Sequence, residues 1–79
     1  MNRRQALAVY LAEAKAQVER GNALVMKQRN KVLQLNRDQR DTTSAVVVLG
    51  YLERELARHV ADRDRLIDEL AGLGPRRIA

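Results

Sequence analysis

The sequence predicts an all-α chain that folds as an antiparallel two-helix hairpin with coiled-coil-like packing and dimerises into a four-helix bundle. Three observations carry this prediction. Apolar residues recur at helical spacing over two long stretches of the 79-residue chain, which is typical of amphipathic helices. One polar gap separates the two stretches. The chain also has four Gly, one Pro and no Cys, a composition that disfavours a turn-rich β fold or a disulfide framework.

The first predicted helix covers about residues 3–37. Asn2 and Gln5 have the spacing of a capping box, in which each side chain accepts a hydrogen bond from the other residue's backbone N–H. Behind this start, two rows of residues repeat every seven positions and form one stripe on a helical wheel. The stripe consists of Leu7, Leu11, Ala14, Val18, Gly21, Val25, Gln28, Val32 and Leu35.

A polar turn is expected at about residues 38–43. Residues 36–44 contain no bulky apolar side chain, and residues 41–44 (Asp-Thr-Thr-Ser) are all good N-caps for a second helix. A short connection makes the two helices antiparallel neighbours. With the turn centred near residue 40, residue i should lie opposite about residue 81 − i, so that Val25 faces Leu56.

The second predicted helix covers about residues 44–73. Val46, Val47 and Val48 alone would favour a strand, but this run is short, has no pairing partner and leads directly into a helical stripe. Gly74 suits the left-handed position after a helix and Pro75 cannot continue one, so residues 75–79 are expected to form a frayed tail. The stripe consists of Leu49, Leu52, Leu56, His59, Arg63, Leu66, Leu70 and Leu73, widened by Val60 and Ile67.

Apolar residues also lie off both stripes, and this excess predicts self-association. A helix with apolar residues on several faces is usually buried on several faces, and a chain of fewer than about 80 residues gains little stability from its own core. A homodimer with a two-fold axis is the simplest solution. The first helix carries Val9, Leu24, Met26 and Leu33 off its stripe, and in the second helix Val46, Val47 and Val48 point in three directions, so at least one of them leaves the seam. The core of the hairpin and its dimer should include Leu11, Val18, Val25, Val32, Leu49, Leu52, Leu56, Leu66 and Leu70.

His59 and Arg63 share one helix face and fall on the apolar stripe. Burying an unpaired Arg is costly, so a partner is expected, for which Glu19 and Gln28 are candidates along with Glu55. A functional interpretation is a pH-sensitive or ligand-binding polar layer, since an unperturbed His titrates near pH 6.5. Two structural interpretations are favoured: a polar layer that sets register and oligomeric state, or side chains that flank the core and reach water.

Positive charge is concentrated in the first half of the chain. Residues 1–40 hold nine basic and three acidic residues, whereas residues 41–79 hold six and seven. Arg20, Lys27 and Lys31 project along one side of the first helix and are candidate contacts for an anionic partner. No aromatic side chain interleaves with them to stack on bases, and the favoured interpretation is a solvated helix face.

The sequence offers no candidate catalytic residue, cofactor site or metal site. There is no Cys nucleophile, the only Ser is better used as a cap, and one His cannot build a multi-His metal site. No run approaches the ~20 apolar residues that span a bilayer, and Glu13 and Lys15 interrupt the apolar stretch that a signal peptide would need. We therefore expect a cytoplasmic protein that is not an enzyme and does not contact membranes.

Two functions fit these observations. The first is a small adaptor protein that acts through the protein–protein contacts of its homodimeric helical bundle. The alternative is an RNA- or DNA-binding regulator that uses the basic first helix. Its predicted shape resembles that of the RNA-binding Rop proteins, which are dimers of helical hairpins, although no Rop sequence signature is present. That resemblance is one of architecture alone.

Overall fold

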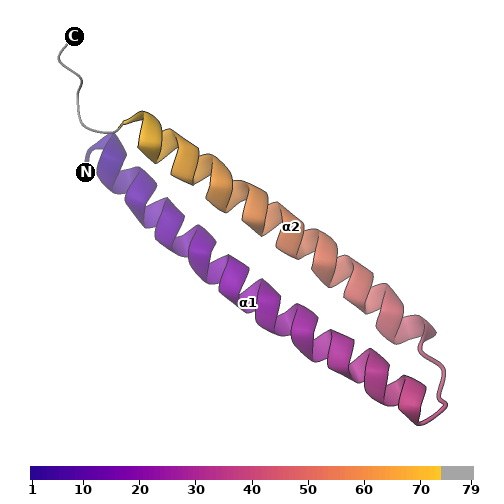
Figure 1. The fold of residues 1–79 in the computed structure, drawn as a ribbon. Helices are drawn as coiled ribbons and strands as arrows, with labels where there is room; N and C mark the ends of the chain where they lie inside the picture. The colour runs from indigo at the N-terminus through magenta and orange to yellow at the C-terminus, as the bar shows by residue number, and fades with distance from the viewer. Residues whose placement is uncertain (74–79) are drawn as a thin grey trace.

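The computed structural model describes residues 1–73, and they form two long helices (Figure 1). Helix α1 spans Arg3–Arg37 and helix α2 spans Thr43–Gly72. The helices run antiparallel, side by side along their whole length, so the predicted all-α helical hairpin is confirmed. The stop signal at Gly74 and Pro75 and the expected tail at 75–79 lie outside the described residues.

The start of α1 is fixed by the predicted capping box. The side-chain oxygen of Asn2 accepts a hydrogen bond from the backbone N–H of Gln5 at 2.8 Å. In return, the side-chain oxygen of Gln5 accepts one from the backbone N–H of Asn2 at 2.9 Å. Both bonds satisfy N–H groups that the first turn of a helix otherwise leaves without an intrahelical partner.

The end of α1 is a Schellman motif built on a glutamine. The backbone N–H of Arg40 donates to the carbonyl of Leu35 at 2.8 Å, and that of Gln39 donates to the carbonyl of Asn36 at 3.1 Å. This pair of bonds requires a left-handed backbone at the first residue after the C-cap. That residue is Gln39, and its φ is 56°. A residue with a Cβ has a steric cost in this conformation that Gly lacks.

The start of α2 is capped by Asp41. One carboxylate oxygen of Asp41 accepts hydrogen bonds from the Thr43 hydroxyl at 2.7 Å and from the Thr43 backbone N–H at 2.9 Å. Thr42 occupies the N-cap position, but its side chain makes no capping hydrogen bond. The two bonds from Thr43, first from its hydroxyl and then from its backbone, hold the pKa of the exposed Asp41 carboxyl below its ordinary value.

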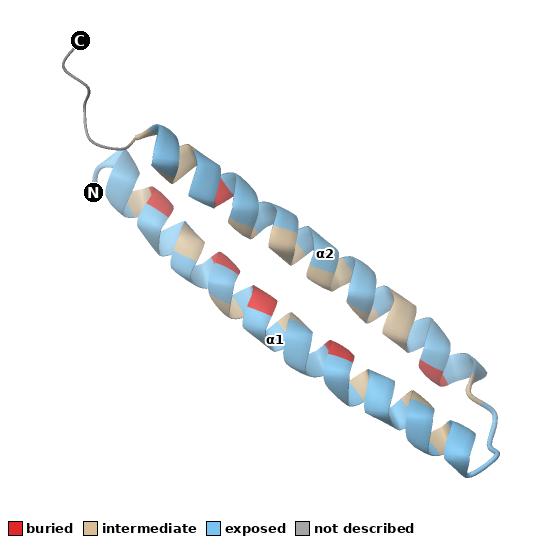
Figure 2. Ribbon diagram, in the orientation of Figure 1, coloured by how far each residue is buried: buried red, intermediate tan, exposed pale blue. Residues whose placement is uncertain are grey.

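The core is a single seam between the helices (Figure 2). Its buried residues are few, and none of the nine predicted core positions is exposed. Val18, Val25 and Leu66 are buried, and the other six are half-buried. The buried set among the described residues is Leu7, Ala14, Val18, Val25, Ala45 and Leu66.

The pairing of the helices is shifted by about one turn from the predicted register. A Cβ built on Gly21 would lie 3.7 Å from the Cα of Leu56, so Gly21, and not Val25, lies opposite Leu56. The prediction assumed a turn with residue 40 at its centre. Instead, the Schellman motif folds the connection back, and α1 extends past the first residues of α2 (Figure 1). The predicted register was therefore wrong by about four residues, close to one 3.6-residue turn.

Candidate interaction surface

The four residues predicted to form a buried polar layer are not buried in the hairpin. Among residues 1–73, no polar or charged side chain is buried. His59, Arg63 and Gln28 are half-buried, whereas Glu19 is exposed. Each flanks the seam, which corresponds to the third interpretation of the sequence pattern, in which the polar ends reach water.

The bonding partners of these residues also differ from those proposed. Arg63 binds its neighbour Asp64 and not Glu19, with Nη2 and Nε lying 2.9 and 3.1 Å from one carboxylate oxygen. Gln28 donates from its side-chain amide to the backbone carbonyl of Ala45 at 2.9 Å. The Gln28 bond ties α1 to the first turn of α2. Sequence reasoning missed this role because the acceptor is a backbone atom.

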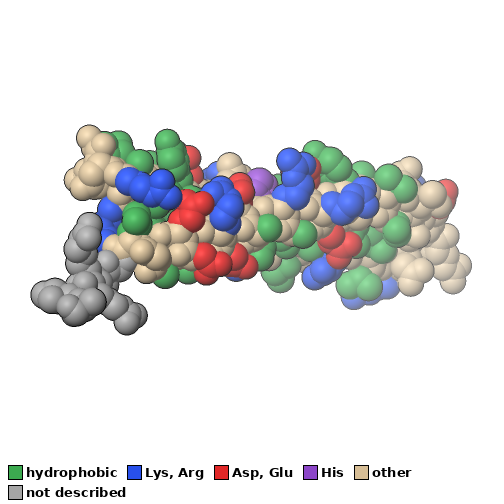
Figure 3. Space-filling view, turned by 90° about the horizontal axis from the view of Figure 1, so that it is seen from above, with side chains coloured by type: hydrophobic (Ala, Val, Ile, Leu, Met, Phe, Trp, Pro, Cys, Tyr) green, Lys and Arg blue, Asp and Glu red, His purple; other side chains and the backbone are tan. Residues whose placement is uncertain are grey.

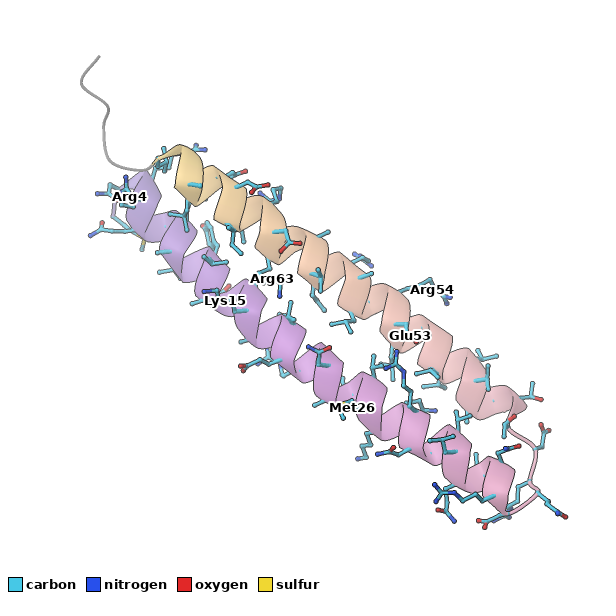
Figure 4. The ribbon with its side chains drawn as sticks, in the orientation of Figure 1. Arg4, Lys15, Met26, Glu53, Arg54 and Arg63 are labelled. Atoms are coloured by element: carbon cyan, nitrogen blue, oxygen red, sulfur yellow. The ribbon has the colours of Figure 1, made fainter. Side chains whose placement is uncertain are left out.

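One face of the hairpin is marked by an ion pair between the helices. Nη2 of Arg29 lies 2.9 Å from Oε2 of Glu53. Residues at seven-residue intervals share a helix face, so Lys15 and Asn22 lie on the same side of α1 as Arg29. A shallow groove lined by Lys15, Asn22, Arg63 and Ile67, with Val18 and Glu19, confirms the placement. Figure 4 shows Arg63 reaching from α2 toward α1 near Lys15.

On α2 this face is largely apolar, and we call it the valine face. Its row on α2 is Val46, Glu53, Val60 and Ile67, spaced every seven residues. Val46 and Ile67 are exposed and Val60 is half-buried. The one carboxylate in the row, that of Glu53, is neutralised by Arg29. The valine face therefore offers apolar surface beside the half-buried residues of the seam.

The opposite face carries an acidic row on α2. Glu55, Asp62 and Glu69 follow one another at seven-residue intervals. Arg3 of α1 reaches Glu69 across the seam at 4.0 Å, and a groove lined by Tyr10, Gln17, Asp62 and Glu69, among others, opens on this side. We call it the acidic-row face. Two arginines of α2 balance the row: Arg58 pairs with Glu55, and Arg65 pairs with Asp62 and Glu69.

Within residues 1–73, the three predicted anion-contacting residues make no ion pair. Arg20, Lys27 and Lys31 are exposed, and within the described part of the chain no carboxylate lies within 4.0 Å of them. Elsewhere the charges are mixed. Figure 3 shows basic side chains beside acidic ones along much of the visible face, with hydrophobic side chains between them.

The predicted off-stripe apolar residues are all exposed. Figure 4 places Met26 on the outer side of α1, away from α2. Each of these side chains is at least 45% accessible, so the hairpin does not cover them itself. The exposed residues from this prediction are Val9, Leu24, Met26, Leu33, Val46, Val47 and Val48.

The hairpin exposes more surface than a compact chain of its size. Its accessible surface is 6393 Å² for 9.0 kDa, whereas a compact monomer of that mass exposes about 4,900 Å². Its radius of gyration is 18.3 Å, against about 12 Å for a globular domain of this length. The dimensions of 65 × 23 × 14 Å describe a layer one helix thick. Neither broad side of that layer is covered by other structure in residues 1–73.

The described residues form neither a metal-ion cluster nor a membrane-spanning segment. Within residues 1–73, no three His, Asp or Glu side chains gather closely enough to hold a metal ion. Neither α1 nor α2 has a segment long and apolar enough to cross a membrane. Comparison of the chain with protein-family models, with curated proteins and with solved structures gives no match.

Proposed function

We propose that this chain is a non-enzymatic adaptor that forms a homodimeric four-helix bundle and presents the outer faces of that bundle to a protein partner. The observation that carries the proposal is the excess surface of about 1,500 Å² over a compact monomer. A standard interface removes about 800 Å² from each partner. One broad side of the hairpin therefore has enough area for a second copy.

The valine face is the side that fits a second copy best. A two-fold axis brings the same surface of each copy together. On the acidic-row face it would bury Glu55, Asp62 and Glu69 together with the arginines that pair with them, and removing so many charges from water is costly. The valine face brings apolar side chains together, and its carboxylate at Glu53 already has a partner in Arg29.

Dimerisation through the valine face would also complete the burial of the seam. Leu49 and Leu56 are half-buried in the hairpin and lie beside the valine row. Arg63, with Asp64 as its partner, lies at the edge of the same groove. In the proposed bundle Arg63 becomes part of an internal polar layer, of the kind that sets register and oligomeric state in coiled coils.

Sedimentation equilibrium on three chains tests the proposed dimer. The wild-type chain should have twice the monomer mass at micromolar concentration, whereas Ile67→Glu should be shifted toward the monomer because it places a charge in the valine row. Val47→Glu is the matched control, because Val47 is 66% exposed and lies on another side of the same helix. A wild-type chain that is monomeric and cooperatively folded contradicts the proposal, as does dissociation caused equally by both substitutions.

A further inference from the structure

A second apolar surface lies on the acidic-row side, in the half of the hairpin near the turn. Its exposed members are Leu24 of α1 and Val48 and Tyr51 of α2, which are 50%, 45% and 56% accessible. The hydrogen bond from Gln28 to the carbonyl of Ala45 brings these segments together. Leu24 lies one turn before Gln28, and Val48 lies about one turn after Ala45. We call this surface, with the cations described next, the basic patch.

Three cations of α1 border the apolar residues of this patch. Arg20 lies four residues before Leu24, Lys27 three residues after it and Lys31 seven residues after it, so all three flank Leu24 on the surface of α1. None of them has a carboxylate within ion-pair distance in the described part of the chain. The patch therefore combines exposed apolar area with positive charge that the hairpin does not neutralise.

The charge distribution along the hairpin shows that the feature is local. Residues 20–52, the half nearest the turn, hold six basic and two acidic residues, whereas residues 1–19 and 53–73 together hold seven basic and eight acidic. In the half far from the turn, ion pairs with carboxylates are formed by Arg3, Arg58, Arg63 and Arg65. A negatively charged partner is thus attracted to the half of the hairpin near the turn.

We propose that the basic patch is the docking site for an acidic amphipathic helix of another protein. Leu24 and Val48 would contact its apolar face, and Arg20, Lys27 and Lys31 would contact carboxylates on its flanks. The first and last of these cations lie 11 residues apart on α1, or roughly 17 Å, which matches about three turns of a partner helix. The inference rests on the proposed adaptor function, because it names the class of partner that such an adaptor would bind.

An acidic helix fits this surface better than RNA does. A phosphate backbone would use the three cations but would leave the exposed apolar side chains of Leu24 and Val48 without a role. Bases stack on aromatic side chains, and Tyr51 is the one aromatic residue at this patch. An apolar surface bordered on its α1 side by three cations is the arrangement that an amphipathic helix with an acidic flank complements.

The test is binding of a synthetic peptide helix to the full chain, measured by fluorescence anisotropy. The probe has Leu at alternating three- and four-residue spacing and Glu on both flanks, and a matched probe has Lys in place of every Glu. We expect the Glu probe to bind at least about tenfold more tightly than the Lys probe. Its affinity should fall when NaCl is raised from about 50 mM to about 300 mM, because salt screens exposed charges.

Substitutions in the chain separate the patch from general charge effects. Leu24→Gln should weaken binding of the Glu probe about tenfold, and the double substitution Lys27→Glu and Lys31→Glu should weaken it further. Val9→Gln and Arg54→Glu are the controls, because Val9 is far from the patch on α1 and Arg54 lies on the outer side of α2 (Figure 4). Both controls should leave the affinity within about twofold of wild type.

The same series distinguishes failure of this inference from failure of the proposed dimer. Equal binding of the Glu and Lys probes overturns the inference, and so does tighter binding of an RNA hairpin than of the Glu probe. A measurement of mass accompanies every variant. A dimeric chain that ignores the Glu probe contradicts the docking site alone, whereas a monomeric chain that binds it contradicts the dimer and supports the docking site.

Discussion

Gly21 of α1 packs directly against Leu56 of α2, and this contact marks the register of the hairpin. A Cβ at position 21 would lie 3.0 Å from Cδ1 of Leu56 and 3.6 Å from its Cβ. The other helical glycines have no such neighbour: a Cβ at Gly50 would meet only Nη1 of Arg54 at 3.5 Å, and one at Gly72 would meet nothing within 4 Å. The absence of a side chain at position 21 therefore lets the two backbones approach.

The first prediction compares two Gly→Ala substitutions in helix interiors. Gly50→Ala should raise the free energy of unfolding by about 1 kcal/mol, because Ala restricts the unfolded chain and favours a helix. Gly21→Ala should raise it by clearly less, because the Cδ1 methyl of Leu56 must move aside. Urea denaturation of both variants at one protein concentration measures the difference. Equal stabilisation by the two substitutions would show that the Gly21–Leu56 contact is looser than described.

The second prediction concerns the turn at the end of α1. Gln39→Gly should raise the free energy of unfolding by about 1 kcal/mol, because Gln39 has a left-handed backbone that Gly adopts without steric cost. Gln17→Gly, in the middle of α1, is the control and should destabilise the chain by a similar amount. Thermal denaturation followed by circular dichroism checks both. Destabilisation by Gln39→Gly would contradict the Schellman geometry of the turn.

The third prediction is a pH dependence that originates at the start of α2. The pKa of Asp41 is lowered in the folded chain by the bonds from Thr43, so the ionised carboxylate stabilises the fold. This stabilisation is fully present well above the ordinary pKa of 3.8. It disappears as the pH falls through that value to the lower pKa of the folded state.

The measurement for Asp41 is the difference in Tm between wild type and Asp41→Ala over a pH series. The difference should be constant near neutral pH and should shrink as the pH falls below about 4. Asp68→Ala, which removes an exposed carboxylate with no capping role, controls for net charge. A Tm difference that does not change with pH would mean that the carboxylate is not the cap.

The fourth prediction concerns the ion pair between Arg29 and Glu53. The side chains are 56% and 45% accessible in a single hairpin, so solvent screens the pair there and a monomer would show a coupling energy below about 1 kcal/mol. The proposed dimer covers this pair on the valine face, so we expect a coupling energy above that limit at concentrations where the chain is dimeric. A double-mutant cycle with Arg29→Ala and Glu53→Ala measures this energy by urea denaturation. A coupling below about 1 kcal/mol in a dimeric chain would contradict the placement of the second copy on the valine face.

The helices and their first cap were predictable because their signals are local. The seven-residue repeat of Leu11, Val18 and Val25 and the pairing of Asn2 with Gln5 depend only on neighbouring residues. The register was not predictable in the same way. It depends on the left-handed residue of the turn, and Gln39 does not signal that conformation as Gly would.

At the candidate site, too, the sequence predicted the local positions of residues but not their burial or their bonding partners. The stripe placed His59 and Arg63 near the seam, where they lie, but a stripe does not reveal whether a narrow seam buries its edge. Four consecutive cap-forming residues left the capping role open, and only the structure assigns it to Asp41. The seven-residue rows beside the stripe, such as Val46, Val60 and Ile67, were the signal that could have separated the two faces.

The mass of the wild-type chain in solution tests the central claim most directly. Sedimentation equilibrium across about 1–100 µM should give about 18 kDa, twice the 9.0 kDa of one chain. The thermal midpoint should rise with concentration over the same range, because association stabilises the folded state. A mass of 9.0 kDa throughout, together with cooperative unfolding at a midpoint independent of concentration, would contradict the proposed four-helix bundle.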